Sequence, residues 1–235
     1  MSLANVHQDI VTCNKCARLR SYCTEIARIK RAAFRNDTYW AKPVPGFGDP
    51  NARVLILGLA PAAHGANRTG RVFTGDGVGA SGDFLMAGMH RNGFANISTS
   101  QSPDDGLRLI DAYIAAAVRC APPDNKPTPE EIHACRPHLH AELEYLPNIK
   151  IVVALGKIAF DVWWQVMAEK GVVLRPRPAF GHGVVCKVPG SPIVIGSYHP
   201  SRQNTNTGKL TPSMMAAIFR KAATLLQPSR LGPAR

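Results

Sequence analysis

The chain has 235 residues, of which 45% are hydrophobic and 19% charged, a composition typical of a folded protein rather than a disordered one. Its 28 Lys and Arg residues outnumber 16 Asp and Glu, and the formal net charge of +12 argues against an acidic-surfaced metabolic enzyme. It indicates a polyanionic partner, nucleic acid first and an anionic membrane second, and residues 170–235 carry ten of the cationic residues without a single carboxylate.

The N-terminal residues indicate an intracellular, cytoplasmic protein. Residues 1–10 have no cationic start followed by an apolar run, and no stretch approaches the roughly 20 apolar residues of a membrane-spanning helix. Cysteines in a reducing compartment more often bind metal or pack in the core than form disulfides. Among the six cysteines, Cys13 and Cys16 form a C-x2-C pair, and fourteen residues separate Cys120 from Cys135.

These two cysteine pairs could form one four-thiolate site, for zinc or for an iron–sulfur cluster. The wide spacing of the second pair and the lack of a His at finger spacing near the first pair favour a cluster. Four unrelated cysteines are the alternative.

The order of apolar and helical segments predicts an α/β fold in one domain, residues 1–235, with a basic tail over about 227–235. Four short apolar runs predict strands at residues 54–59, 113–118, 149–155 and 192–197. Helices are predicted between and after them, at residues 81–92, 128–146, 157–170 and 212–226. This alternation indicates a sandwich with helices on both faces of a mostly parallel sheet, with ligands at the carboxyl ends of the strands.

The loop after the first strand reads G-L-A-P-A-A-H-G-A-N-R-T-G-R-V-F-T-G-D. Its small residues let a ligand approach the backbone and leave N–H donors free. It lacks the G-K-[ST] ending of a Walker A loop and the spacing of a dinucleotide fingerprint. Its one carboxylate is Asp76 and its one aromatic is Phe73; a turn residue and a core residue are the structural alternatives.

The loop after the fourth strand, S-Y-H-P-S-R-Q-N-T-N-T-G-K, places His199 at a strand end before a run of polar residues. Amide and hydroxyl groups together with Arg202 and Lys209 suit contacts to phosphate.

With G-L-A-P-A-A-H-G, F-T-G-D and H-P-S-R-Q-N-T-N-T-G in this order, and with the paired cysteines, the chain resembles the iron–sulfur uracil-DNA glycosylases, and within them family 5, type b. The resemblance covers residues 13–226. It implies a three-layer αβα sandwich with a central four-stranded parallel sheet, flipping of a damaged base out of DNA and hydrolysis of its N-glycosidic bond. It also implies a [4Fe–4S] cluster, held by Cys13, Cys16, Cys120 and Cys135.

The resemblance also assigns roles in the site. Asp76 is expected to position water, with Asn125 as the open alternative for this role. His199 is expected to donate to the leaving base, and Phe73 to stack on that base. The loop carrying Gly58, Leu59, Ala60 and Ala63 is expected to line the base pocket with backbone amides. Expected contacts to DNA are those of Arg68, Arg71, Ser201, Arg202, Gln203 and Asn204.

Two departures from related families bear on mechanism and specificity. Other uracil glycosylases carry a polar residue where Leu59 or Ala60 stands, so Asp76 is the only carboxylate in this loop. Relatives with G-E-A-P-G carry a base-reading Asn where this chain has Ala116, and Asn125 is the nearest substitute. The expected partner is therefore double- or single-stranded DNA containing uracil or another deaminated base, bound by a monomer with relaxed specificity.

Two other functions stay open on the sequence alone. One is an iron–sulfur electron-transfer or radical enzyme, which is disfavoured by the lack of a C-x3-C-x2-C signature and of a flavin or nicotinamide fingerprint. The other is a non-catalytic iron–sulfur module that binds nucleic acid. The sequence does not assign roles to His64, Cys23 or Cys186, and it does not rank uracil, hypoxanthine, xanthine, ethenocytosine and thymine as substrates.

Overall fold

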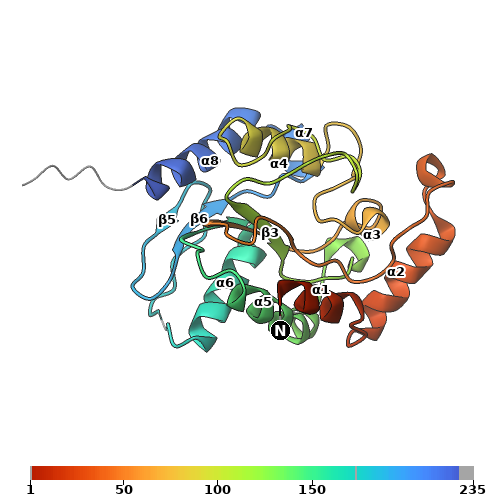
Figure 1. Ribbon diagram of the computed structural model, residues 1–235, viewed down its shortest axis with the longest axis horizontal. Coiled ribbons are helices and arrows are strands. Elements are labelled where there is room, and N and C mark those ends of the chain that lie inside the picture. Colours follow the sequence, from red (N-terminus) through yellow and green to blue (C-terminus); the bar gives the residue numbers. More distant parts are fainter. Residues whose placement is uncertain (1, 173, 228–235) are drawn as a thin grey trace, which may run out of the picture.

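A central sheet runs through the computed structural model, which describes residues 2–172 and 174–227 (Figure 1). Its strand order is β1-β3-β2-β4-β6-β5. The four inner strands are parallel and the two short edge strands are antiparallel to their neighbours. The strands are β1 (Phe47–Gly48), β2 (Val54–Gly58), β3 (Ala112–Ala116), β4 (Ile151–Leu155), β5 (Val185–Cys186) and β6 (Ile193–Ser197).

The inner strands form because their side chains are apolar on both faces of the sheet. Along β2, Val54 and Ile56 belong to one core, whereas Leu55 and Leu57 belong to the other. The first core contains residues of α4 (Ser81–His90) and α8 (Pro212–Leu226), and the second contains residues of α5 (Pro129–Glu144) and α6 (Lys157–Glu169). Figure 1 shows the first two helices on one side of the sheet and the other two on the opposite side, which confirms the three-layer sandwich.

The four predicted strands and four predicted helices are all present, with ends shifted by at most a few residues. The start of α5 follows the sequence signal closely, because the Thr128 side chain and Glu131 form a reciprocal capping box. Among the described residues, no helix has the length and apolar character needed to cross a membrane.

Several elements were not predicted. They are the two edge strands, the helices α1 (Leu3–Val11), α2 (Ala17–Ile29), α3 (Ala66–Thr69) and α7 (Arg202–Asn206), and the 3-10 turns η1 (Ala32–Phe34) and η2 (Pro123–Asn125). The sheet therefore has six strands among the described residues, rather than the four expected. Of the predicted basic tail, residues 228–235 lie outside the described part of the chain.

Parallel pairing places the carboxyl ends of β2, β3, β4 and β6 on the same side of the sheet, across the strand ends. We call this side the carboxyl edge. The loops that follow Gly58, Ala116, Leu155 and Ser197 therefore meet there, as expected for a ligand site in this class of fold.

Candidate active site

Two loops that are far apart in the sequence meet at the carboxyl edge. The ring of Phe73, in the loop after β2, lies beside the ring of His199, which follows β6. Their centroids are 5.8 Å apart and their planes are inclined by 32°. The guanidinium of Arg202 donates a hydrogen bond to the main-chain carbonyl of Asp76 at 3.3 Å. The structure thus brings together four of the residues predicted from the two motifs.

Phe73 is held in an unusual backbone conformation by close neighbours. Its φ of 53° lies in the left-handed region, which is rare for a bulky residue. A Cβ atom on Gly82, in the first turn of α4, would lie 2.2 Å from the Phe73 carbonyl oxygen, and one on Gly58 would lie 2.9 Å from the Phe73 ring. Glycine at these two positions leaves room for the backbone and the ring of Phe73 at the end of β2.

The carboxyl group of Asp76 is packed against the backbone of its own loop. A Cβ atom on Gly65 would lie 1.7 Å from Asp76 Oδ1, so only glycine leaves room for this carboxyl. Burial raises the pKa of Asp76 to about 6, although the nearby cations of Arg202 and Arg68 lower it. At neutral pH the group is mostly an anion and can accept a proton from water.

His199 is a neutral imidazole at physiological pH, because burial lowers its pKa to about 4. Its main-chain carbonyl accepts a hydrogen bond from the Asn204 side-chain amide at 2.8 Å. On the other side, a Cβ atom on Gly156, which follows β4, would lie 3.6 Å from His199 Cβ. The imidazole can therefore act as a hydrogen-bond donor without carrying charge.

The polar run after His199 forms the short helix α7 instead of an open loop. Ser201 is its N-cap and accepts a hydrogen bond from the Asn204 amide at 3.4 Å. Arg202 and Gln203 are exposed, whereas Ser201 and Asn204 are partly buried. The four residues predicted to contact DNA in this segment thus lie in the first turn of one helix, beside His199.

The start of the loop after β2 leaves backbone donors free. The carbonyls of Gly58 and Leu59 accept hydrogen bonds from Ala117 at 3.0 Å and Val118 at 2.9 Å. Within the described residues, the amides of Leu59, Ala60 and Ala63 donate no backbone hydrogen bond. They are available to a bound ligand, as the sequence led us to expect for the base pocket.

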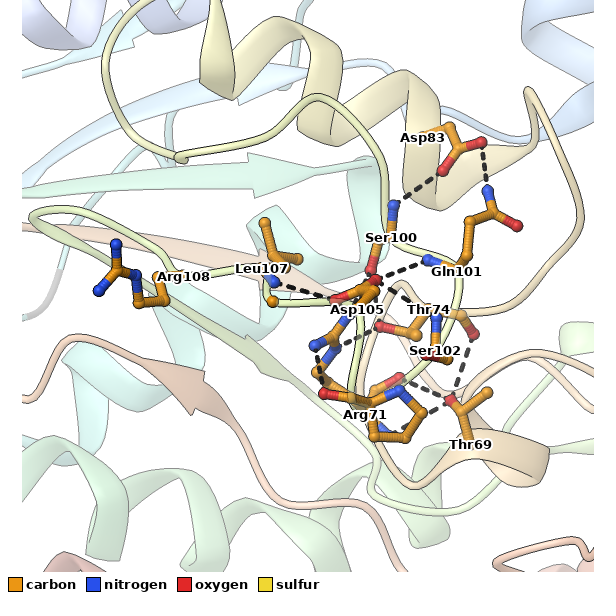
Figure 2. A network of polar contacts seen from close by, with 12 residues as sticks. Thr69, Arg71, Thr74, Asp83, Ser100, Gln101, Ser102, Asp105, Leu107 and Arg108 are labelled. Carbon is orange, nitrogen blue, oxygen red and sulfur yellow. Dashed lines mark hydrogen bonds and ion pairs between the residues drawn. The ribbon is translucent and has the colours of Figure 1, made fainter.

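Arg68 and Arg71, two of the predicted phosphate contacts, are engaged inside the protein. Arg68 pairs with Asp37 at 2.6 Å and donates to the Gly75 carbonyl at 2.6 Å. Arg71 pairs with Asp105 at 2.8 Å and donates a hydrogen bond to Thr74 Oγ1 (Figure 2). Both side chains are at most 13% exposed, so their visible role is to hold the loop that carries Phe73 and Asp76.

Asn125 ends the η2 turn after β3, with a left-handed φ of 57°. Within the described part of the chain, its side chain makes no hydrogen bond, and its expected role in positioning water stays a prediction. His64 has a structural partner, because its Nδ1 lies 2.9 Å from the Tyr39 hydroxyl.

The sequence did not point to His182. Its Nδ1 accepts the backbone N–H of Tyr198 at 3.1 Å, and its ring lies 5.0 Å from the Tyr198 ring. This contact fixes the residue before His199. The only sequence signal is a His between two glycines, which is too common to indicate a role.

The four paired cysteines lie around one pocket. Cys13 follows α1, Cys16 is the N-cap of α2, Cys120 follows β3, and Cys135 is on α5. The Arg119 amide donates to Cys135 Sγ at 3.2 Å. Of the other cysteines, Cys23 is buried on α2 and donates to the Ala121 carbonyl at 3.6 Å, whereas Cys186 is buried on β5.

Four cysteines line this pocket, a donor set that fits either zinc or an iron–sulfur cluster. Among the described residues, no three His, Cys, Asp or Glu side chains converge closely enough to hold one ion. Lys15 and Arg20 line the same pocket, as does Arg119, whose guanidinium pairs with Glu142.

The fold and this edge define an α/β protein with candidate ligand-binding groups at the carboxyl ends of its strands. A family model described as the uracil DNA glycosylase superfamily matches residues 45–223. Relatives similar along nearly the whole chain identify the branch. The type-5 uracil-DNA glycosylase of Mycobacterium bovis is 48% identical over 225 residues, which are 95% of this chain and 82% of the relative.

A protein with the same name from Thermus thermophilus is 48% identical over 218 residues, 93% of this chain and 95% of the relative. Another from Pyrobaculum aerophilum is 43% identical over 233 residues, 95% of this chain and 97% of the relative. The chain belongs to the type-5 uracil-DNA glycosylases of this superfamily.

Proposed function

We propose that this protein is a monofunctional DNA repair glycosylase that hydrolyses the N-glycosidic bond of uracil in DNA and leaves an abasic site. The observation that carries this proposal is the meeting of Phe73, Asp76 and His199 at the carboxyl edge of a type-5 family chain. These three residues supply a stacking surface, a carboxylate and a neutral donor, which are the groups this hydrolysis requires.

The target nucleotide first leaves the base stack, which costs a few kcal/mol and least for a mispaired base. Phe73 is the proposed stacking partner of the flipped base, because its ring is fixed at the end of β2 beside His199. Free amides at Leu59, Ala60 and Ala63 are proposed to donate to the edge of the base.

In the chemical step, the bond between C1′ and the base nitrogen breaks, and both electrons leave with the base. The sugar gains oxocarbenium character and the base becomes an anion, so donors aimed at the base stabilise the transition state more than the ground state. A neutral His199 suits this role, because the uracil anion needs a hydrogen bond rather than a full proton.

Water completes the reaction. Asp76 is proposed to hold one water molecule, accept its proton as the oxygen bonds to C1′, and then release that proton to solvent. A pKa of about 6 leaves the carboxylate ionised at pH 7 while keeping it a better base than an exposed Asp. Its negative charge also stabilises the sugar cation. Asn125 is the second candidate for orienting this water.

The pocket is proposed to accept other deaminated bases besides uracil. Ala116, at the place of a base-reading Asn in related families, is buried in β3 and offers no polar side-chain group. Without a dedicated reader, discrimination between bases depends on backbone amides, which is weaker than readout by a matched side chain.

Contact with the DNA backbone is proposed for the first turn of α7, where Ser201, Arg202, Gln203 and Asn204 offer an N-terminal helix end, a guanidinium and amides. Both double- and single-stranded DNA can meet this surface. We propose that the protein acts as a monomer on chromosomal DNA, in the cytoplasm at the nucleoid.

Cys13, Cys16, Cys120 and Cys135 are proposed to hold a [4Fe–4S] cluster, which would supply a structural cross-link rather than reaction chemistry. Support comes from the common pocket, which is also lined by the cationic side chains of Lys15 and Arg20. Ala60 and Ala63 pack against the apolar cluster that contains Cys120 and Cys135. A cluster that holds these cysteines in place would therefore also hold the loop proposed to line the base pocket.

The test is a set of otherwise identical duplexes that contain uracil, hypoxanthine, xanthine, ethenocytosine or thymine at one position. Purified protein with its cluster intact is expected to make alkali-labile sites at uracil. His199→Ala and Asp76→Asn are expected to lose about 100-fold or more in single-turnover rate while DNA binding changes little. Intact uracil DNA after prolonged incubation would contradict the proposal, and unchanged behaviour of both variants would favour a non-catalytic binding module.

A further inference from the structure

The guanidinium of Arg68, on α3, joins the two sides of the loop that carries Asp76. Its Nε donates to the His64 carbonyl at 3.0 Å, and its Nη2 donates to the Gly75 carbonyl at 2.6 Å. A Cβ atom on Gly75 would lie 2.7 Å from Arg68 Nη2, so glycine leaves room for the guanidinium. The side chain therefore holds the peptide group that directly precedes Asp76.

The same guanidinium is fixed from behind by the segment between α2 and β1. Asp37 Oδ2 accepts a hydrogen bond from Arg68 Nη1 at 2.6 Å, and the Phe34 ring centroid lies 4.0 Å from Arg68 Cζ. The Arg68 carbonyl also accepts the Trp40 amide at 2.8 Å. Since these contacts use the face of the guanidinium and three of its nitrogens, its orientation toward Gly75 is determined by the fold.

Three charged side chains act on the carboxyl group of Asp76 from three different helices. Burial raises its pKa, Arg202 on α7 and Arg68 on α3 lower it, and Asp83 on α4 raises it. His199 also lies at this edge, but burial lowers its pKa to about 4, so it is neutral where Asp76 titrates. Burial likewise lowers the pKa of His64.

The two cations differ in what happens to them when DNA binds. Arg202 is exposed and is a proposed contact to phosphate, whose negative charge would offset the charge of the guanidinium. The Arg68 side chain is only 13% exposed and is held inside the protein. Arg68 is therefore the cation whose effect on Asp76 persists in a complex with DNA.

We propose that Arg68 is a positioning residue for the glycosylase reaction, which holds Asp76 in place and keeps its carboxyl group in the charged form while DNA is bound. The inference rests on the proposed function, since it concerns the group proposed to activate water. Arg68 acts through Asp76 and touches no reacting atom. Without this cation, the buried carboxyl group would keep its proton to higher pH and could not accept one from water.

The test measures the single-turnover rate of uracil excision between about pH 5 and pH 9. In Arg68→Gln, we expect the acid limb of the profile to move up by about one pH unit. The rate would then be roughly fivefold below wild type at about pH 6 and would approach the wild-type value above about pH 8.

Asp37→Asn removes the negative partner of the same guanidinium. It is expected to move the acid limb in the opposite direction, to lower pH, because the positive charge of Arg68 is then less compensated at Asp76. Opposite shifts from the two members of one ion pair are not expected from a loss of structure. If Arg68→Gln does not fold, Asp37→Asn decides, and an acid limb that stays in place or moves up would overturn the inference.

Arg71→Gln is the matched control. Arg71 is similarly buried and holds the same loop through Asp105, whereas the cations that lower the pKa of Asp76 are Arg202 and Arg68. We expect Arg71→Gln to reduce the rate by the same factor at every pH, with the acid limb unmoved. An Arg68→Gln profile of that form, or one identical to wild type, would overturn the inference and leave the glycosylase proposal intact.

Urea unfolding tests the same inference without any measurement of activity. A raised pKa of Asp76 makes the fold less stable as the pH rises toward that pKa, and Asp76→Asn removes this effect. In the Arg68→Gln background, the stability gain from Asp76→Asn should continue to grow up to about pH 7, rather than level off near pH 6. Wild-type protein that excises no uracil would overturn the proposed function, and unfolding would still decide whether Arg68 controls the charge of Asp76.

Discussion

Asp76 and His199 show how one physical cause serves two chemical roles. Burial disfavours the charged form of any group, so it raises the pKa of the carboxyl to about 6 and lowers the pKa of the imidazole to about 4. The result is a carboxylate that can still take a proton near neutral pH and a histidine that stays neutral there. At neutral pH the two groups therefore have the protonation states proposed for water activation and for stabilisation of the leaving base.

The raised pKa of Asp76 has a stability cost that substitution should reveal. Its usual value of 3.8 applies to the unfolded chain, so raising the pH from about 4 to 6 ionises this group in the unfolded state first and disfavours the fold. Asp76→Asn cannot ionise. We expect this variant to be more stable than wild type by about 1–2 kcal/mol at pH 7.5, with the gain vanishing toward pH 4.

Urea unfolding at both pH values measures this difference. Asp161→Asn is the matched control, because the Asp161 side chain on α6 is 41% exposed and pairs only with Lys157 within the described part of the chain. It is expected to bring no such gain. A stability difference for Asp76→Asn that is the same at pH 4 and pH 7.5 would contradict the prediction.

At the scale of elements, the sequence predicted the strands that are buried on both faces. The inner strands were recognisable because both faces of β2, β3 and β4 are buried, which leaves an uninterrupted apolar run. The edge strands have two residues each, too few for a periodic signal, and α7 is built from polar residues only. Such elements form through tertiary contacts that no local pattern contains.

The candidate site shows the same division. Phe73, Asp76 and His199 could be selected from motifs at strand ends, and the structure brings them together. The pairing of Arg71 with Asp105 joins loops 34 residues apart, so the sequence could not separate a structural arginine from a phosphate contact.

A buried ion pair links the segment that follows β3 to α5. Arg119 and Glu142 are 1% and 0% exposed, and their closest side-chain atoms are 2.5 Å apart. Glu142 also accepts hydrogen bonds from the Gly46 amide at 2.8 Å and the Tyr113 hydroxyl at 3.2 Å. A buried cation that loses its partner cannot recover hydration, so the cost of breaking this pair is large.

We expect Glu142→Gln to lower the free energy of unfolding by about 3–5 kcal/mol. Glu25→Gln, which removes an exposed partner of Arg28 on α2, is expected to change it by less than about 1 kcal/mol. Thermal and urea unfolding of both variants provide the comparison, and equal effects would contradict the assigned importance of burial.

At the scale of the whole molecule, the net charge of +12 is distributed by the fold. Several cationic side chains are used internally, among them Arg68, Arg71 and Arg119, and are not free to meet a phosphate. Arg202 is exposed at the carboxyl edge and has only a carbonyl as its side-chain partner within the described residues. Location rather than total charge therefore determines which cations meet DNA.

Arg202→Gln is expected to weaken DNA binding for all sequences alike and to reduce the slope of log K against log salt by about 1. Arg53→Gln removes the same charge from the opposite edge, where Arg53 pairs with Asp111 at 2.5 Å, and should leave the slope unchanged. Binding titrations over a range of salt concentrations measure both slopes. Identical slopes for the two variants would remove Arg202 from the proposed contact.

The cysteine pocket also has a consequence for the order of synthesis. Its thiols come from a segment before α2, from the end of β3 and from α5, so the last of them, Cys135, is separated from the first by more than half of the chain. All four can meet only after α5 has left the ribosome and β3 has taken its place beside β2. Loading of the proposed cluster would therefore follow the synthesis of α5, and it would join the segment between α1 and α2 to the segment after β3.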